Sequence, residues 1–219
     1  MKPLLELRRV FFRYGKRSPY ILSGVNLKII RGKVYCIVGE NGSGKTTLLH
    51  IMAGLLEPEK GEVLLDGKPL KEQLPRARRL IGILFQNPET MLFNPTVYDE
   101  IAYAPRQLFD EGETRKRVLE SARLLGIEDL LERPTTSLSY GEKKVVALAS
   151  IISYDPEIIL LDEPLSNLHP ERKRRVLNMI RSLAAKGKAV VITSPDLELL
   201  DNICDVTLTL SEGRLKEGG

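Results

Sequence analysis

The segment that most constrains the fold of this chain is GENGSGKT at residues 39–46. It matches the pattern G-x-x-x-x-G-K-S/T, and it lies between the apolar run 34–38 and the helical pattern TTLLHIMAGL. Glycines let backbone N–H groups surround phosphate oxygens, and a helix N-terminus adds a positive dipole end. Lys45 would direct its charge at the β- and γ-phosphates, and the Thr46 hydroxyl can bind Mg²⁺. The segment therefore predicts a nucleotide-binding loop (P-loop), and the alternative is a glycine-rich turn without a ligand.

A second candidate site lies in EIILLDEP, where Asp162 and Glu163 follow an apolar strand. Adjacent carboxylates at the end of a buried strand are costly unless they meet a cation or transfer a proton. Asp162 fits the acid that supports Mg²⁺ in P-loop NTPases, and Glu163 fits a base that polarises the attacking water. The alternative is a helix N-cap at the end of a strand.

The apolar runs VYCIVG, EIILLDE and AVVIT predict strands that are buried on both faces, as in a central parallel sheet. Alternating runs near the N-terminus and around Gly61 predict a smaller antiparallel sheet. We therefore expect an α/β P-loop NTPase fold with a RecA-like core. The expected strands are residues 4–12, 25–30, 34–38, 62–65, 81–85, 158–161, 189–193 and 205–210.

Helical periodicity dominates residues 87–155, as in TRKRVLESARLLGI and KKVVALASII. This pattern predicts a helical lobe inserted between two strands of the core. The 219 residues then form a single domain, whose core and antiparallel sheet occupy residues 1–86 and 156–219.

The chain has a formal net charge of +4, and its basic runs lie among helical patterns, so we expect them on solvated helix faces.

The two cysteines of the chain, Cys36 and Cys204, are far apart and show no disulfide or metal-binding spacing, which favours a reducing compartment. Cys36 fits a small core residue. The N-terminus does not look like a signal peptide, and no apolar run reaches the roughly 18 residues of a membrane span. We therefore expect a cytosolic chain that contacts a membrane only through a partner.

Three further segments carry a family resemblance. LSYGE at residues 138–142 resembles the ABC signature Leu-Ser-Gly-Gly-Gln, FQNP at residues 85–88 resembles the Q-loop, and FRYG at residues 12–15 resembles the A-loop. Together with the P-loop, they make nearly the whole chain similar to the ATP-binding subunits of ABC transporters. The segment FQNPETMLFNPTVYDEIAYAP is similar to that of energy-coupling factor and cobalt-type importers. Those importers take up vitamins or metal ions, using two ATPase subunits, a membrane coupling subunit and a substrate-binding membrane protein.

The resemblance implies that the chain binds and hydrolyses ATP with Mg²⁺ in a head-to-tail dimer with a second ABC ATPase subunit. Tyr14 would lie against the adenine ring, while Ser139 and Gly141 would close over the γ-phosphate held by the partner's P-loop. The implied catalytic residues are Glu163, Gln86 and Lys45, and the implied metal ligands are Thr46, Gln86 and Asp162. The implied ATP-binding residues are Tyr14, Gly39, Asn41, Gly42, Ser43, Gly44, Lys45, Thr46, Thr47, Ser139 and Gly141.

A transmembrane coupling subunit is the other implied partner, which places the chain peripherally on the cytoplasmic face of the membrane. A groove near Gln86 would receive a helix of that subunit. The apolar residues behind the Q-loop are the candidates for its edge: Met91, Leu92, Phe93 and Val97.

The chain departs from the family pattern at several positions. Pro195 stands where the family has a histidine that contacts the γ-phosphate, and proline offers neither a side-chain donor nor an N–H. The segment Thr193 to Asp196 is therefore interpreted as a turn, with Asp196 as the cap of the next helix. Thr193 or Ser194 would offer a hydroxyl, although one residue out of register.

His169 replaces the usual aspartate of the D-loop, and Tyr140 and Glu142 replace a glycine and the glutamine of the signature. His169 has no other ligand type at useful spacing, so we do not expect it to bind a metal. His50 follows the P-loop on a helix and is expected to be structural. Taken together with Pro195, these departures suggest a non-identical partner and two unequal sites, although the sequence alone does not decide between a heterodimer and a homodimer.

Two other functions fit part of the pattern. A weakly hydrolysing scaffold subunit is favoured by Pro195, whereas the intact Lys45, Gln86 and Glu163 oppose it. An ABC protein that acts on nucleic acid usually has two cassettes or a long coiled-coil insertion, and this chain shows neither. Nucleic acid is therefore not an expected partner, and the transported substrate cannot be inferred from the sequence.

Overall fold

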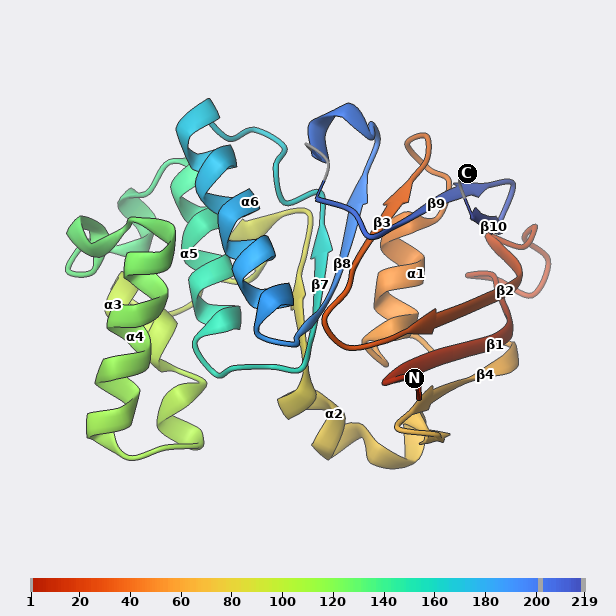
Figure 1. The fold of residues 1–219 in the computed structure, drawn as a ribbon, viewed down its shortest axis with the longest axis horizontal. Helices are drawn as coiled ribbons and strands as arrows, with labels where there is room; N and C mark the ends of the chain where they lie inside the picture. Colours follow the sequence, from red (N-terminus) through yellow and green to blue (C-terminus); the bar gives the residue numbers. More distant parts are fainter. Residues whose placement is uncertain (1, 201–202, 218–219) are drawn as a thin grey trace.

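The computed structural model describes residues 2–200 and 203–217, and it places a six-stranded sheet between a helical lobe and a second sheet (Figure 1). The strand order is β10-β9-β3-β8-β7-β6. Neighbouring strands from β9 to β6 are parallel, and β10 pairs with β9 in the antiparallel direction. The strands are β3 (Val34–Val38), β6 (Ile81–Leu84), β7 (Ile158–Asp162), β8 (Ala189–Ser194), β9 (Val206–Ser211) and β10 (Arg214–Glu217).

The second sheet is antiparallel, with the order β2-β1-β4-β5, and helix α1 (Lys45–Met52) lies between the two sheets in Figure 1. Leucines and isoleucines of α1 pack in one core cluster with both sheets. This helix therefore joins the P-loop to the antiparallel sheet. The strands are β1 (Leu5–Phe12), β2 (Leu22–Ile29), β4 (Lys60–Leu65) and β5 (Lys68–Pro69).

The helical lobe is formed by α3, α4 and α5, all of which lie between β6 and β7 in the sequence (Figure 1). Helix α6 covers the face of the parallel sheet that is turned toward the lobe, since its apolar side chains share a cluster with the lobe and with β3. The α-helices besides α1 are α2 (Leu74–Leu80), α3 (Val97–Ala102), α4 (Glu111–Leu125), α5 (Tyr140–Ile152) and α6 (Pro170–Ala185). Short 3₁₀ turns occupy Leu70–Gln73, Pro88–Thr90, Pro105–Gln107, Glu128–Leu130, Thr135–Ser137 and Glu198–Leu200.

The alternation of side chains in the central strands explains their continuous apolar sequence. In β3, Val34 and Cys36 face the cluster shared with the lobe, whereas Tyr35 and Ile37 face α1 and the antiparallel sheet. Both faces of the strand are therefore buried, which requires apolar residues at successive positions. Each expected strand is present, with ends that differ by up to three residues. The edge strands β5 and β10 were not predicted, because they are short and mostly polar.

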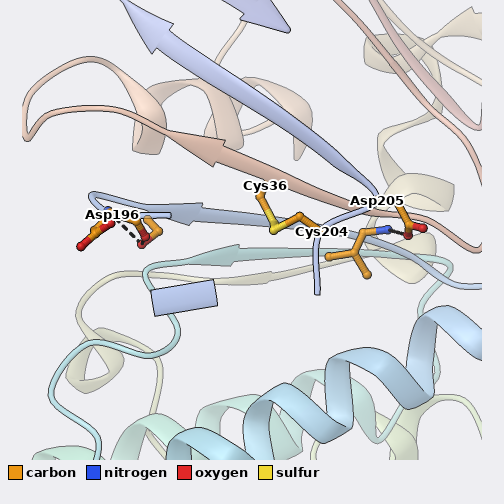
Figure 2. The surroundings of a disulfide bond; sticks show 6 residues. Cys36, Asp196, Cys204 and Asp205 are labelled. Atoms are coloured by element: carbon orange, nitrogen blue, oxygen red, sulfur yellow. Dashed lines mark hydrogen bonds between the residues drawn. A yellow bond between two sulfur atoms is a disulfide. The ribbon is translucent and has the colours of Figure 1, made fainter. Parts of the chain in front are cut away.

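The cysteine prediction was wrong, because the structure joins Cys36 and Cys204 in a disulfide across 168 positions of sequence (Figure 2). Strand β9 pairs in parallel with β3, so the segment that precedes β9 returns to β3 and brings the two Cα atoms within 5.7 Å. Asp205 accepts a hydrogen bond from the Val34 N–H at 2.8 Å beside the disulfide. The separation of the two cysteines in the sequence gave no indication that they are neighbours in the fold. Cys36 is buried in the core, as expected. The expectation of a reducing compartment rested on two unpaired cysteines, and the disulfide removes that reason.

No helix in the described ranges is long and apolar enough to cross a membrane.

Candidate nucleotide-binding site

The candidate site lies at the edge of the parallel sheet where the strands end. Strand β3 leads into the P-loop, β6 ends just before Gln86, β7 ends at Asp162, and β8 ends at Ser194. Parallel strands end at a common edge, and this edge is the usual ligand-binding edge of open α/β sheets. Residues that are far apart in the sequence are thereby gathered into one region.

The P-loop is folded tightly around the ammonium group of Lys45. This side chain is 5% exposed, and its Nζ donates to the carbonyl oxygens of Gly39 at 2.7 Å and Glu40 at 3.0 Å. A Cβ at Gly39 would collide with the Leu210 carbonyl oxygen, and Gly44 has a φ of 102° at the start of α1. Only glycine fits both positions without strain. The loop backbone is therefore held close to the charge that would meet a phosphate.

Two threonines hold the carboxylate of Asp162. The Thr46 hydroxyl donates to Oδ2 at 2.6 Å, and the Thr193 hydroxyl donates to Oδ1 at 2.6 Å. Asp162 is 2% exposed, so a buried carboxylate lies directly beside the Thr46 hydroxyl at the start of α1. Such hard oxygen ligands are those that Mg²⁺ prefers, and the ion usually keeps waters and substrate phosphates as its other ligands. Among the described residues, no group of three or more His, Cys, Asp or Glu residues is placed to bind a metal.

Glu163 follows Asp162 in a left-handed backbone conformation, with a φ of 46°. Its N–H donates to the Thr193 hydroxyl at 3.1 Å, so Thr193 positions both acidic residues. The sequence pointed to Thr193 only as a possible phosphate contact. In the structure its hydroxyl serves the carboxylate of Asp162 instead.

A buried polar atom in the P-loop supports the fit of a phosphate. Among the residues that the structure describes, the Ser43 hydroxyl is one of three buried side-chain polar atoms without a hydrogen-bond partner. A buried hydroxyl without a partner costs about 1–3 kcal/mol, and a phosphate oxygen bound in the loop would supply the missing acceptor. The neighbouring Asn41 and Gly42 are exposed at the tip of the loop.

Tyr14 is brought to the first turn of α1, where its hydroxyl lies 3.1 Å from the Thr47 hydroxyl. The ring is 63% exposed and packs edge to face on Phe12, with the ring centroids 5.0 Å apart. An exposed aromatic face beside the P-loop is a suitable surface for a purine ring. The A-loop and the P-loop therefore meet in the folded chain.

Ser139 and Gly141 lie at the start of α5 in the lobe, not in the core that carries the P-loop. Ser139 forms a capping box with Glu142, whose carboxylate accepts from the Ser139 N–H at 2.8 Å and hydroxyl at 2.9 Å. The Ser139 N–H contributes most to lowering the pKa of Glu142, and the hydroxyl and Arg172 add to the effect. Arg133 and Arg172 also form ion pairs with Glu142. Within the single chain, the start of α5 is an exposed helix cap whose polar groups are hydrogen-bonded to one another.

The tyrosine of the signature ties the lobe to the Q-loop. The Tyr140 hydroxyl donates to the carbonyl oxygen of Gln86 at 3.1 Å. Three residues further along α5, Lys143 forms an ion pair with Glu89 at 2.6 Å. The side chain of Gln86 is exposed beside these contacts. The sequence predicted altered packing at Tyr140 but not its partner, because the partner is a backbone atom.

The segment at the end of β8 is a turn followed by a cap. The Ser194 hydroxyl donates to the Asp196 carbonyl at 2.6 Å, and the Glu198 N–H donates to the Asp196 carboxylate at 2.9 Å. The predicted turn and cap are therefore present, although the capped element is a 3₁₀ turn at Glu198–Leu200. Pro195 is exposed at the tip.

The two histidines lie on different elements of the chain. His50 packs edge to face on Phe85 at 5.5 Å between ring centroids, which supports its predicted structural role. His169 is exposed just before α6. The D-loop departure therefore lies on the surface, where a second subunit would meet it.

The chain is similar to known proteins in sequence and in fold. The ABC transporter family matches residues 22–166. An energy-coupling factor transporter ATP-binding protein of Methanocaldococcus jannaschii is 36% identical over 98% of this chain and 78% of its own length. The solved structure of cbiO1 from Clostridium perfringens, part of the ABC transporter complex cbiONQ, is 32% identical, with a TM-score of 0.88 over 100% of this chain and 89% of that one. A dimeric ABC transporter cassette, MJ0796, is 27% identical with a TM-score of 0.88, covering 98% and 97% of the two chains.

Proposed function

The chain belongs to the ABC transporter family, and from this premise we propose that it hydrolyses ATP to drive an energy-coupling factor type importer. The observation that carries the proposal is the 2.6 Å hydrogen bond between the Thr46 hydroxyl and the Asp162 carboxylate. It joins the P-loop helix to the end of β7, and Glu163 is the residue that follows Asp162. Similarity to an energy-coupling factor ATPase and to cbiO1 supports the importer class.

Each residue of the site has a distinct task in this proposal. Lys45 brings a positive charge to the β- and γ-phosphates, and backbone N–H groups of the P-loop surround them. Glu163 polarises the attacking water, while Gln86 orients it from the end of β6. Thr46, Asp162 and Gln86 would hold Mg²⁺, which would supply positive charge to the phosphate oxygens.

The second subunit completes the site in this proposal. Ser139 and Gly141 of one chain would close over the γ-phosphate bound to the P-loop of the other, with the N-terminus of α5 adding its positive dipole end. For this contact, the Ser139 hydroxyl must turn from Glu142 toward the nucleotide. The dimeric cassette among the structural neighbours supports such an assembly.

Steady-state phosphate release at saturating MgATP tests the hydrolytic role. Glu163→Gln should lower phosphate release by about 10²–10⁴-fold, because it removes the base while leaving a side chain of the same shape. ATP affinity measured by calorimetry should stay within about twofold, since the P-loop is unchanged. Glu120→Gln, at an exposed glutamate of α4, is the matched control. Equal phosphate release from wild type and Glu163→Gln would reject Glu163 as the base, and no release above background by wild type with its partner would reject the proposed hydrolysis.

The lobe offers an anchor for the proposed membrane subunit. Phe93 is 66% exposed, and its ring packs edge to face on Tyr103 with centroids 4.8 Å apart. Exposed aromatic pairs are frequent anchors of protein interfaces. Met91 and Leu92 are half-buried against the lobe. Val97 was wrongly placed at the groove edge, because it is fully buried at the start of α3.

Co-purification with the membrane coupling subunit tests this contact. Phe93→Glu should prevent co-purification and leave ATP affinity unchanged, because a charge replaces an apolar anchor far from the P-loop in sequence. Leu119→Glu changes an exposed leucine of α4 in the same way and should leave assembly intact. Unchanged assembly with Phe93→Glu would place the interface elsewhere.

A second candidate function, a weakly hydrolysing scaffold subunit, is favoured by the end of β8. The hydroxyls of Thr193 and Ser194 are engaged with Asp162 and with the Asp196 backbone, and Pro195 has no donor. A chain with this arrangement would bind ATP but depend on its partner for turnover. Phosphate release by the chain alone and by the chain with its partner distinguishes the two functions.

A further inference from the structure

Lys144 is a fully buried lysine that the motifs do not explain. It lies on α5, five residues after Ser139, and it is 0% exposed. A lysine is almost never fully buried unless its ammonium is paired. Its surroundings therefore indicate what the side chain does.

Three acceptors from one loop surround the Lys144 ammonium. Nζ donates to the Glu163 carbonyl at 3.1 Å, to the Ser166 carbonyl at 3.1 Å and to the Ser166 hydroxyl at 2.7 Å. A protonated lysine has three N–H donors, so all of them are used. The Ser166 hydroxyl in turn donates to the Glu163 carbonyl at 2.9 Å. The buried ammonium group on α5 therefore directs all three of these hydrogen bonds to the loop that begins with Glu163.

The backbone of that loop needs such support. Glu163 has a φ of 46° and Asn167 a φ of 59°, which are uncommon values for residues other than glycine. Residues in such conformations persist when the surrounding structure holds them. The Glu163 N–H is held by Thr193 and its carbonyl by Lys144. Both backbone polar groups of Glu163 are therefore bound by side chains from other elements.

The charge of Lys144 fits this position. Burial lowers the pKa of its ammonium, and the nearby carboxylates of Glu163 and Asp162 oppose that effect. The Tyr140 ring also lies near the ammonium, 5.5 Å from Nζ to its centroid. The bonds to the loop go to carbonyl and hydroxyl oxygens, so Lys144 supports Glu163 without neutralising its carboxylate by a direct hydrogen bond.

We propose that Lys144 is the positioning residue for Glu163: its ammonium fixes the loop 163–167 so that the carboxylate is directed at the attacking water. The inference rests on the proposed ATP hydrolysis at this site. Lys144 also lies on the helix whose start would meet the partner's nucleotide. Helix α5 would therefore link that start to Glu163, the proposed catalytic base of this chain's own site. A shift of about 1 Å in a catalytic group costs on the order of 100-fold in rate, so removing the support should act on turnover.

Lys144→Met tests the proposal, because methionine keeps an unbranched apolar side chain and removes the three donors. The turnover number should fall about 10–100-fold while ATP affinity by calorimetry stays within about twofold. Lys144→Arg keeps the charge and should recover part of the lost turnover. Lys116→Met, at an exposed lysine of α4, is the control for loss of a lysine.

Ser166→Ala is the second variant, in case Lys144→Met does not fold. It removes one acceptor of Lys144 and one donor to Glu163, and it should lower turnover less than Lys144→Met does. Circular dichroism and thermal unfolding establish that each variant is folded.

A double-mutant comparison separates positioning from a general structural role. In a Glu163→Gln background, Lys144→Met or Ser166→Ala should cause no further loss of residual hydrolysis, because the group they position is already gone. An equal further loss in that background, or unchanged turnover in the folded single variants, would overturn the proposal. If wild type, measured with its partner, releases no phosphate above background, the proposed hydrolysis itself fails.

Discussion

The P-loop region and the start of α5 differ in how far along the sequence their stabilising partners lie. Thr46 bonds to Asp162 across 116 positions, and Cys36 is joined to Cys204 across 168. In contrast, Ser139 and Glu142 cap α5 from only three positions apart. Lys45 and Asp162 of the first region are buried, whereas Ser139 and Tyr140 of the second are exposed.

This contrast has consequences for folding and for binding. A site made of long-range contacts exists only when the whole core is folded, since each contact requires strands that are distant in sequence to be neighbours. A capping box forms with its own helix and stabilises it locally. The P-loop region is therefore assembled within one chain, whereas the cap of α5 becomes a binding site only with a second subunit in the function that we propose.

The largest effect is expected from the disulfide, which joins residues 168 positions apart beside the P-loop region. Cys36→Ser with Cys204→Ser should lower the unfolding free energy by about 2–5 kcal/mol, because a long loop in the unfolded chain is no longer closed. Denaturant unfolding with and without a reducing agent measures the change. The reducing agent should destabilise wild type and leave the double variant unaffected. Equal stability of the two proteins under oxidising conditions would show that the bond contributes nothing.

The next largest effect is expected on the ATP affinity of the chain, which should depend on the P-loop region but not on the start of α5. Lys45→Ala should weaken ATP binding by about 100-fold, since charge-assisted hydrogen bonds contribute about 1.5–3 kcal/mol each. In the isolated chain, Ser139→Ala should change the affinity by less than about twofold, because the proposed function assigns Ser139 to the site of the partner. Calorimetry with MgATP measures both. An equal loss in both variants would contradict the division into two half-sites.

A smaller effect is expected at the end of β8. Pro195→His should raise turnover about tenfold or more, because it adds a donor to the charge that develops on the γ-phosphate. The substitution also releases the fixed φ of proline, so unfolding is measured in parallel. Steady-state phosphate release at saturating MgATP is the test. Unchanged turnover in a folded variant would mean that another group already supplies this contact.

The smallest effect is expected at the cap of α5. Glu142→Gln keeps an acceptor for Ser139 but loses the ion pairs with Arg133 and Arg172, so stability at pH 7 should fall by at most about 1 kcal/mol. The pKa of Glu142 is lowered in the folded chain, so its stabilisation is present above the ordinary pKa of glutamate, about 4.3. It is lost as the pH falls through the lowered value. Unfolding free energies from pH 7 to pH 3 should therefore converge for wild type and variant, and a constant difference would contradict this.

Much of the fold followed from local patterns. The apolar runs located β3, β7 and β8, because strands buried on both faces need apolar residues at every position. Helices α4 and α5 followed from their periodicity. Helix α3 (Val97–Ala102) was not recognised, because six residues are too few to show a helical repeat, and Val97 was consequently placed on the surface.

The sequence by itself determined the P-loop, the paired carboxylates of β7 and the turn at Pro195, because each depends on residue types at short spacing. Only the tertiary structure decided which distant residues meet: Cys36 with Cys204, Tyr14 with Thr47, and Lys144 with the loop of Glu163. The physical reason is that these contacts depend on strand order and on how α5 packs against the core. Strand β9 lies beside β3 although it is last but one along the chain, and no local pattern encodes that neighbour.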